Sequence, residues 1–139
     1  MTDNLNSAQR RELMSRVRGK NTTPELLLRS ILHKAGYRYS LHRRDLPGKP
    51  DIVFAPRRKV IFVHGCFWHG HQKCNQGRPP RSNEAFWSDK LAANLARDRK
   101  ATEELIMDGW QVYVVWTCNL RSARKISETI ARVTHFLEN

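Results

Sequence analysis

A segment rich in histidine and cysteine, residues 64–74, directly follows a run of strand-forming residues. It reads HGCFWHGHQKC and holds three of the six histidines of the chain and two of its three cysteines. Imidazoles and thiolates are the ligands that zinc prefers in four-coordinate protein sites. The segment therefore indicates a metal site, and the aromatic pair within it indicates a contact with nucleic-acid bases.

The spacing of these residues predicts a structural zinc site. Cys66, His71 and Cys74 lie in one short loop that can wrap an ion, and Cys118 follows a distant predicted strand. Together they form a closed Cys₃His set, which is typical of structural rather than catalytic zinc. Bound Zn²⁺ can contribute on the order of 10 kcal/mol to folding, so it would anchor an irregular loop to the edge of a sheet. The alternative is that these are unrelated loop residues.

The order of predicted elements is typical of an α/β fold. Capping residues and apolar periodicity predict helices, and β-branched or alternating runs predict strands. The helices are expected over residues 8–18, 22–35, 84–107 and 122–137, and the strands over 37–41, 49–54, 59–64 and 110–116. The last strand is the most continuously apolar, so we expect it at the centre of the sheet. The sequence predicts a small mixed sheet flanked by helices, in a single domain spanning residues 1–139.

The two strands before the zinc segment are joined by a tight turn and should form a hairpin. In an antiparallel pair the start of one strand lies beside the end of the other. Asp51, at the start of one strand, should therefore lie near His64, at the end of the next. His64 and His69 are left over once the zinc ligands are assigned, and an imidazole suits general acid or base catalysis at neutral pH. A carboxylate such as Asp51 can bind Mg²⁺ together with waters and a substrate phosphate.

The charge of the chain points to a polyanionic partner. Lys and Arg outnumber Asp and Glu by 25 to 13, which gives a formal net charge of +12 spread along the sequence. A solvated basic surface is the alternative explanation. No apolar run approaches the roughly 20 residues of a membrane span, and the start of the chain does not resemble a signal peptide. We expect a cytoplasmic, monomeric protein that binds nucleic acid.

Several motifs together resemble the very-short-patch repair (Vsr-type) DNA mismatch endonucleases. They are LPGKPD at 46–51, VIFVHGCFWH at 60–69, Phe86-Trp87 and VWTC at 115–118. The resemblance implies a fold like that of restriction endonucleases in the PD-(D/E)xK superfamily. It also implies Mg²⁺-dependent nicking of one strand 5′ of the thymine in a T·G mismatch, the lesion left by deaminated 5-methylcytosine. Functional pairing with a mismatch-repair protein and a cytosine-5 methyltransferase is a further implication.

The same resemblance implies catalytic roles for individual residues. Asp51 would bind Mg²⁺ with the backbone carbonyl of Val63, which stands where the family usually carries threonine. His69 would be the general base, and His64 a second catalytic histidine. Glu25 would support the active site, although its place in the first turn of a predicted helix also fits a capping carboxylate.

The resemblance also implies how DNA is held. The aromatic residues Phe67, Trp68 and Trp87 would enter the duplex beside the mismatch, where base pairs separate more easily. Residues 1–20 would clamp the duplex as an N-terminal helix or arm, with contacts from Met14, Arg16 and Arg18.

Two other functions fit the same residues. The first is a zinc-anchored DNA-binding module without catalysis. The second is a zinc hydrolase that binds its metal through His64, His69 and His71 and leaves one position open for water.

Overall fold

The computed structural model describes residues 23–66, 69, 71 and 84–139. It divides into two compact units, one ending at Tyr37 and the other running from Arg38 to Asn139. The helix expected over residues 8–18, and with it the clamping arm of residues 1–20, lies outside the described part. The assignment of residues 1–139 to a single domain stays a prediction.

In the first unit, the described element is the helix α2, Thr23–Lys34. Its first turn carries a proline and an acidic residue, which suit the exposed amides and the positive end of the helix dipole. After it ends, the Tyr37 amide donates to the Leu32 carbonyl over 3.1 Å, and Gly36 takes a φ of +102°. This is the left-handed turn that commonly ends helices at glycine. The predicted start and stop of this helix are confirmed.

The second unit is built on a four-stranded mixed sheet with the order β1-β2-β3-β4. The strands are β1 (Ser40–Leu41), β2 (Ile52–Phe54), β3 (Lys59–His64) and β4 (Gln111–Trp116). β1, β2 and β3 pair antiparallel, and β3 pairs parallel with β4. The short 3₁₀ helix η1, Ala55–Arg57, makes the turn of the predicted hairpin. The predicted mixed α/β fold is confirmed.

The predicted place of the last strand is wrong, because β4 lies at one end of the described sheet rather than at its centre. An apolar character on both faces shows that a strand is covered by helices, and it does not show how many strands flank it. The alternating residues from position 37 also predict a longer first strand than the two residues that pair.

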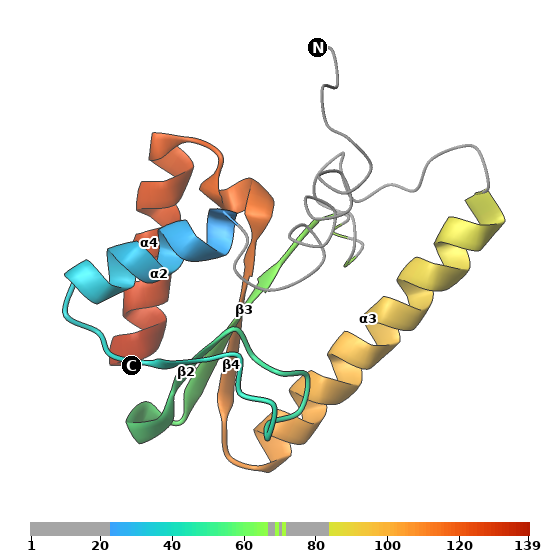
Figure 1. Ribbon diagram of the computed structural model, residues 1–139, viewed down its shortest axis with the longest axis horizontal. Coiled ribbons are helices and arrows are strands. Elements are labelled where there is room, and N and C mark those ends of the chain that lie inside the picture. Colours follow the sequence, from blue (N-terminus) through green and yellow to red (C-terminus); the bar gives the residue numbers. More distant parts are fainter. Residues whose placement is uncertain (1–22, 67–68, 70, 72–83) are drawn as a thin grey trace, which may run out of the picture. The chain divides into compact units, whose positions relative to one another are not determined.

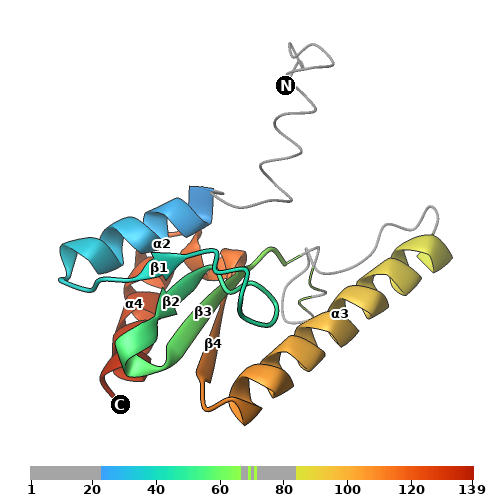
Figure 2. The same cartoon turned by 60° about the horizontal axis from the view of Figure 1, so that its bottom comes forward.

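Two helices lie on opposite sides of this sheet (Figure 1, Figure 2). They are α3, Glu84–Met107, which links the parallel strands β3 and β4, and α4, Ala123–Glu138. Ser122 caps α4 by accepting a hydrogen bond from the Lys125 amide. Within the described residues no helix is both long and apolar enough to cross a membrane.

Side chains alternate along β3 between the two helices. Val60 and Phe62 belong to a core cluster with Val53 of β2, Leu105 of α3 and Trp110. They therefore face α3. The same alternation turns His64 toward α3, and on β2 it puts Asp51 on the face of Val53.

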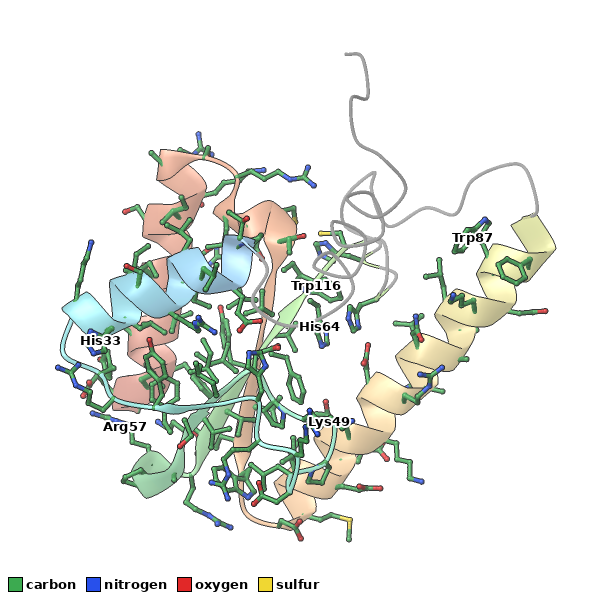
Figure 3. All side chains as sticks on the ribbon, in the orientation of Figure 1. His33, Lys49, Arg57, His64, Trp87 and Trp116 are labelled. Carbon is green, nitrogen blue, oxygen red and sulfur yellow. The ribbon has the colours of Figure 1, made fainter. Side chains whose placement is uncertain are left out.

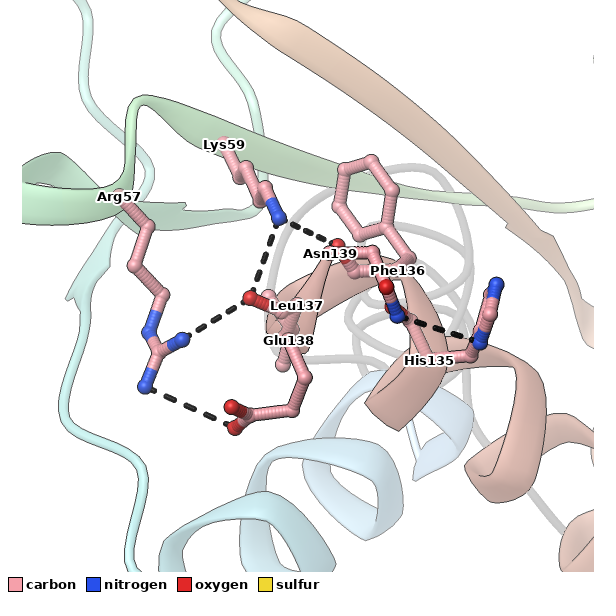
Figure 4. A network of polar contacts seen from close by, with 7 residues as sticks. All are labelled: Arg57, Lys59, His135, Phe136, Leu137, Glu138 and Asn139. Carbon is pink, nitrogen blue, oxygen red and sulfur yellow. Dashed lines mark hydrogen bonds and ion pairs between the residues drawn. The ribbon is translucent and has the colours of Figure 1, made fainter.

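Lys59 lies on the other face of β3 and binds the end of α4. Its ammonium donates to the carbonyls of Phe136 and Leu137, and the Arg57 guanidinium donates to the Leu137 carbonyl over 2.9 Å (Figure 4). The last carbonyls of a helix have no partner within the helix and carry its negative dipole end, so cations stabilise them. The hairpin thus fixes α4 against the sheet.

Candidate active site

The candidate site forms where β3 and β4 end together. Their parallel register pairs His64 with Trp116, so the residues that follow both strands emerge at the same edge of the sheet. The two rings meet edge to face with centroids 5.3 Å apart (Figure 3). The residues after β3 supply His69 and His71, and the 3₁₀ helix η3, Thr117–Leu120, supplies Cys118.

Asp51 reaches this edge from the start of β2. Its Oδ2 accepts a hydrogen bond of 2.7 Å from the backbone amide of Val63, one residue before the end of β3. Its Oδ1 lies 3.8 Å from Nδ1 of His42. The hairpin therefore brings Asp51 beside the end of β3, as the antiparallel pairing predicted. The carboxylate is held in one orientation, with Oδ1 turned to the imidazole.

His64 and His69 stack face to face with a third residue, Asp98, beside them. The two imidazole rings are 3.8 Å apart and 3° from parallel. Nδ1 of His69 lies 2.6 Å from Oδ2 of Asp98, which α3 presents to this face of the sheet. The amide of His69 donates to the Gly65 carbonyl over 3.1 Å, so the turn after β3 also fixes its backbone. A carboxylate on Nδ1 selects the tautomer and leaves Nε2 of His69 to exchange a proton.

His64 is electrostatically different from its neighbour. Burial lowers the pKa of His64 to about 4, with a smaller contribution from His69 in the same direction, while Asp98 opposes the shift. The His64 side chain is therefore a neutral imidazole at physiological pH. A neutral ring can donate one hydrogen bond and accept another, which suits contact with a phosphate or a bound water.

A second group of ligand atoms lies next to Trp116. Atoms of Cys66, His71 and Cys118 all lie within 4.8 Å of one another, and the Cys118 sulfur is 3.5 Å from Nδ1 of His71. The amide of His71 donates to the Cys66 carbonyl over 2.9 Å, which holds two of these ligands next to each other. Two thiols and an imidazole are the donors of a structural zinc site, so the residues fit that ion. Cys74, the fourth predicted ligand, lies outside the described residues.

Trp116 contacts both groups. Its indole stacks on the imidazole of His71 with centroids 4.1 Å apart and planes 7° from parallel, and it meets His64 edge to face. The structure thus places His71 with the thiols, whereas His64 and His69 share a group with Asp98. This arrangement differs from the three-histidine centre of a zinc hydrolase.

The predicted DNA contacts are described only in part. Trp87 lies near the start of α3 (Figure 3), edge to face with Phe86 at 5.2 Å and with the Lys90 ammonium 5.7 Å from its ring. Phe86 is 60% exposed, so this end of α3 presents aromatic surface. The other predicted contacts, Phe67, Trp68, Met14, Arg16 and Arg18, lie outside the described residues.

Glu25 belongs to the first unit. It pairs with Arg29, one turn later on α2, with 3.0 Å between Oε2 and the guanidinium. This contact fits a helix-stabilising ion pair, and the predicted role of Glu25 at the active site stays a prediction.

Two residues of the candidate site, Asp98 and His42, were not predicted from the sequence to belong to it. Asp98 lies in the run Arg97-Asp98-Arg99-Lys100, which resembles an ordinary solvated helix face, and His42 lies in a loop of mixed composition. The only available signal was an isolated carboxylate within a basic run, and that signal is weak without the fold.

Comparisons with known proteins identify the family of this chain. Residues 2–76 match the model of the family described as DNA mismatch endonuclease Vsr. The chain is 57% identical over 120 residues to the type II nicking enzyme V.XorIIP of Xanthomonas oryzae, covering 86% of this chain and 88% of that protein. It is 39% identical to the type II nicking enzyme V.NmeAIP of Neisseria meningitidis, over 100% of this chain and 99% of the relative.

A third relative carries the family name itself. The chain is 37% identical over 128 residues to the DNA mismatch endonuclease Vsr of Escherichia coli, covering 92% of this chain and 81% of that enzyme. Such identities over nearly the whole chain extend the match beyond the residues of the family model. The chain belongs to the Vsr family of DNA mismatch endonucleases, and its substrate is DNA.

Proposed function

We propose that this endonuclease nicks one strand of a duplex on the 5′ side of the thymine in a T·G mismatch, by Mg²⁺-dependent hydrolysis. The observation that best supports this chemistry is the pair of His69 and Asp98, stacked on His64 at the end of the strand that fixes Asp51. A water-activating imidazole and an oriented carboxylate are what phosphodiester hydrolysis needs.

Asp51 would hold the cation. Its carboxylate is oriented by the Val63 amide, and an oxygen ligand suits Mg²⁺, so the residue fits the ion. The backbone carbonyl of Val63 is the second protein ligand that we propose. When bound, Mg²⁺ neutralises charge on the phosphate and acidifies a bound water.

His69 would move the proton. Because Asp98 binds Nδ1, Nε2 can accept a proton from the attacking water, and the carboxylate stabilises the imidazolium that forms. As the water oxygen bonds to phosphorus, the bond from phosphorus to the 3′ oxygen breaks, and that oxygen takes a proton from solvent and leaves as a 3′ hydroxyl. The neutral ring of His64, stacked against His69, would donate a hydrogen bond to the phosphate. The aromatic side chains of Trp87, Phe67 and Trp68 would insert beside the mismatch, where the bases separate more easily than at a correctly paired step.

A matched set of labelled duplexes tests this proposal. Duplexes that differ only in one pair, T·G, T·A or C·G, are incubated with the zinc-loaded chain and Mg²⁺, and the nick is mapped on a denaturing gel. We expect cleavage 5′ of the mismatched thymine, with loss of cleavage in Asp51→Ala and retention of DNA binding. The exposed Asp89→Ala on α3 is the matched control. Equal cleavage of T·A, or an active Asp51→Ala, would contradict the proposal.

We further propose that Cys66, His71, Cys74 and Cys118 bind one structural Zn²⁺. The proximity of the three described ligands supports it. Metal analysis of the purified chain should give one zinc per molecule and much less in Cys118→Ser, whereas His135→Asn, on the exposed side of α4, should keep its zinc. Equal zinc content in Cys118→Ser and the wild type would argue against this site. The pairing with a mismatch-repair protein and a cytosine-5 methyltransferase stays a prediction.

A further inference from the structure

His42 has an unusual backbone that keeps it beside Asp51. β1 ends at Leu41, and His42 then takes a φ of +49°. Non-glycine residues rarely adopt this left-handed conformation, and such positions cluster at functional sites. The His42 amide still donates to the Asp51 carbonyl over 3.1 Å, so the strand pairing continues across the bend. The strained residue is thus registered directly opposite the proposed cation ligand.

The side chains of this pair also face each other. Asp51 uses Oδ2 to accept the Val63 amide, and its Oδ1 lies 3.8 Å from Nδ1 of His42. The His42 side chain is 16% exposed and that of Asp51 is 20% exposed. An ion bound at Oδ1 would therefore be sheltered, with an imidazole nitrogen next to it. At a separation of 3.8 Å, Oδ1 of Asp51 and Nδ1 of His42 can both coordinate one small cation.

The chemistry of the two donors differs. Carboxylate and carbonyl oxygens suit Mg²⁺ and Mn²⁺ alike, whereas an imidazole nitrogen favours transition metals. We propose that His42 contributes an imidazole nitrogen to the cation site of Asp51 and makes the site prefer Mn²⁺ to Mg²⁺. This inference rests on the proposed function only in placing a divalent cation at Asp51.

The test is spectroscopic and does not depend on nicking. The zinc-loaded full chain is titrated with Mn²⁺ alone, and pulsed electron paramagnetic resonance detects ¹⁴N nuclei coupled to the bound ion. The variant is His42→Asn, because asparagine tolerates the left-handed backbone. The control is His135→Asn on α4. Zinc content and thermal unfolding confirm that both variants fold.

We expect a nitrogen coupling in the wild type and in His135→Asn that is absent from His42→Asn. The affinity for Mn²⁺ should fall about tenfold in His42→Asn, while that for Mg²⁺, measured by competition, should change much less. A wild type without nitrogen coupling, or a coupling that persists in His42→Asn, overturns the inference. The wild-type spectrum alone decides the first of these outcomes, even if the variant does not fold.

Asp51→Asn separates this inference from the proposed function. If it abolishes Mn²⁺ binding while the wild type lacks a nitrogen coupling, the cation site stands and the role of His42 falls. If it leaves Mn²⁺ binding unchanged, no cation lies at Asp51, and the inference and the proposed metal site both fail.

Discussion

Replacing Asp98 by asparagine tests the proposed catalytic pair of His69 and Asp98 most directly. In the wild type, Nδ1 of His69 lies 2.6 Å from the Asp98 carboxylate. The asparagine amide has nearly the same shape as the carboxylate, and its oxygen can still accept a hydrogen bond from this nitrogen. What the variant loses is the negative charge that would stabilise a protonated His69. The substitution therefore isolates electrostatics from geometry.

The size of this effect follows from the separation and exposure of the two groups. Opposite unit charges about 4 Å apart attract by roughly 1 kcal/mol in water and roughly 4 kcal/mol in a partly buried setting. The side chains of His69 and Asp98 are 27% and 29% exposed, which places the pair between these limits. A loss of about 2 kcal/mol corresponds to a rate reduced roughly 30-fold.

Single-turnover nicking of a T·G duplex at saturating Mg²⁺ measures this loss, because it reports the chemical step without product release. Asp89→Asn, a change of the same kind on an exposed part of α3, should keep the wild-type rate. DNA affinity and zinc content should not change in either variant. A rate for Asp98→Asn within about threefold of the wild type, which is less than 1 kcal/mol, would refute the assigned role of the carboxylate.

Three further predictions concern stability, each measured by urea unfolding of the zinc-loaded chain. Gly48→Ala should destabilise the chain by about 1–3 kcal/mol, because Gly48 has a φ of +72° and a new Cβ would lie 2.7 Å from that of Ala101. Gly36→Ala is the control: Gly36 also has a positive φ, but nothing lies within 4 Å of the new Cβ, so this variant reports the backbone strain without the clash. Lys59→Met should cost about 1–3 kcal/mol by removing the charged donor to the Leu137 carbonyl, and an unchanged midpoint would contradict this. The pKa of His64 is about 4 in the folded chain and about 6.5 in the unfolded chain, so the unfolded chain takes up the proton first as the pH falls. Acidification from pH 7 to 4.5 should therefore lower the free energy of unfolding by about 2.5 kcal/mol more in the wild type than in His64→Asn.

The sequence predicts those elements whose signals are local. β3 spans the apolar run from which it was predicted. α3 begins after the prolines at 79 and 80 and ends before Gly109, as predicted. Such signals lie within a few residues of each boundary, so the fold does not need to be known. The hairpin that brings Asp51 to the end of β3 is predictable for the same reason, because the tight turn fixes the register.

The remaining features depend on contacts between distant segments. The carboxylate of Asp98 becomes a partner of His69 only because α3 crosses the face of the sheet that His64 shares. The basic residues around Asp98 are only a weak signal that sets it apart from Asp89 on the same helix. The edge position of β4 likewise depends on which strands pair, and apolar composition does not encode it.

The indole of Trp116 is shared by the two groups of ligand atoms. It contacts His71 of the proposed zinc set and His64 of the proposed catalytic set. If DNA bound at His64 changes the affinity for zinc at His71, the coupling free energy is the same in both directions. A duplex that raises the affinity for zinc through this indole would then bind more weakly, by the same factor, once zinc is removed.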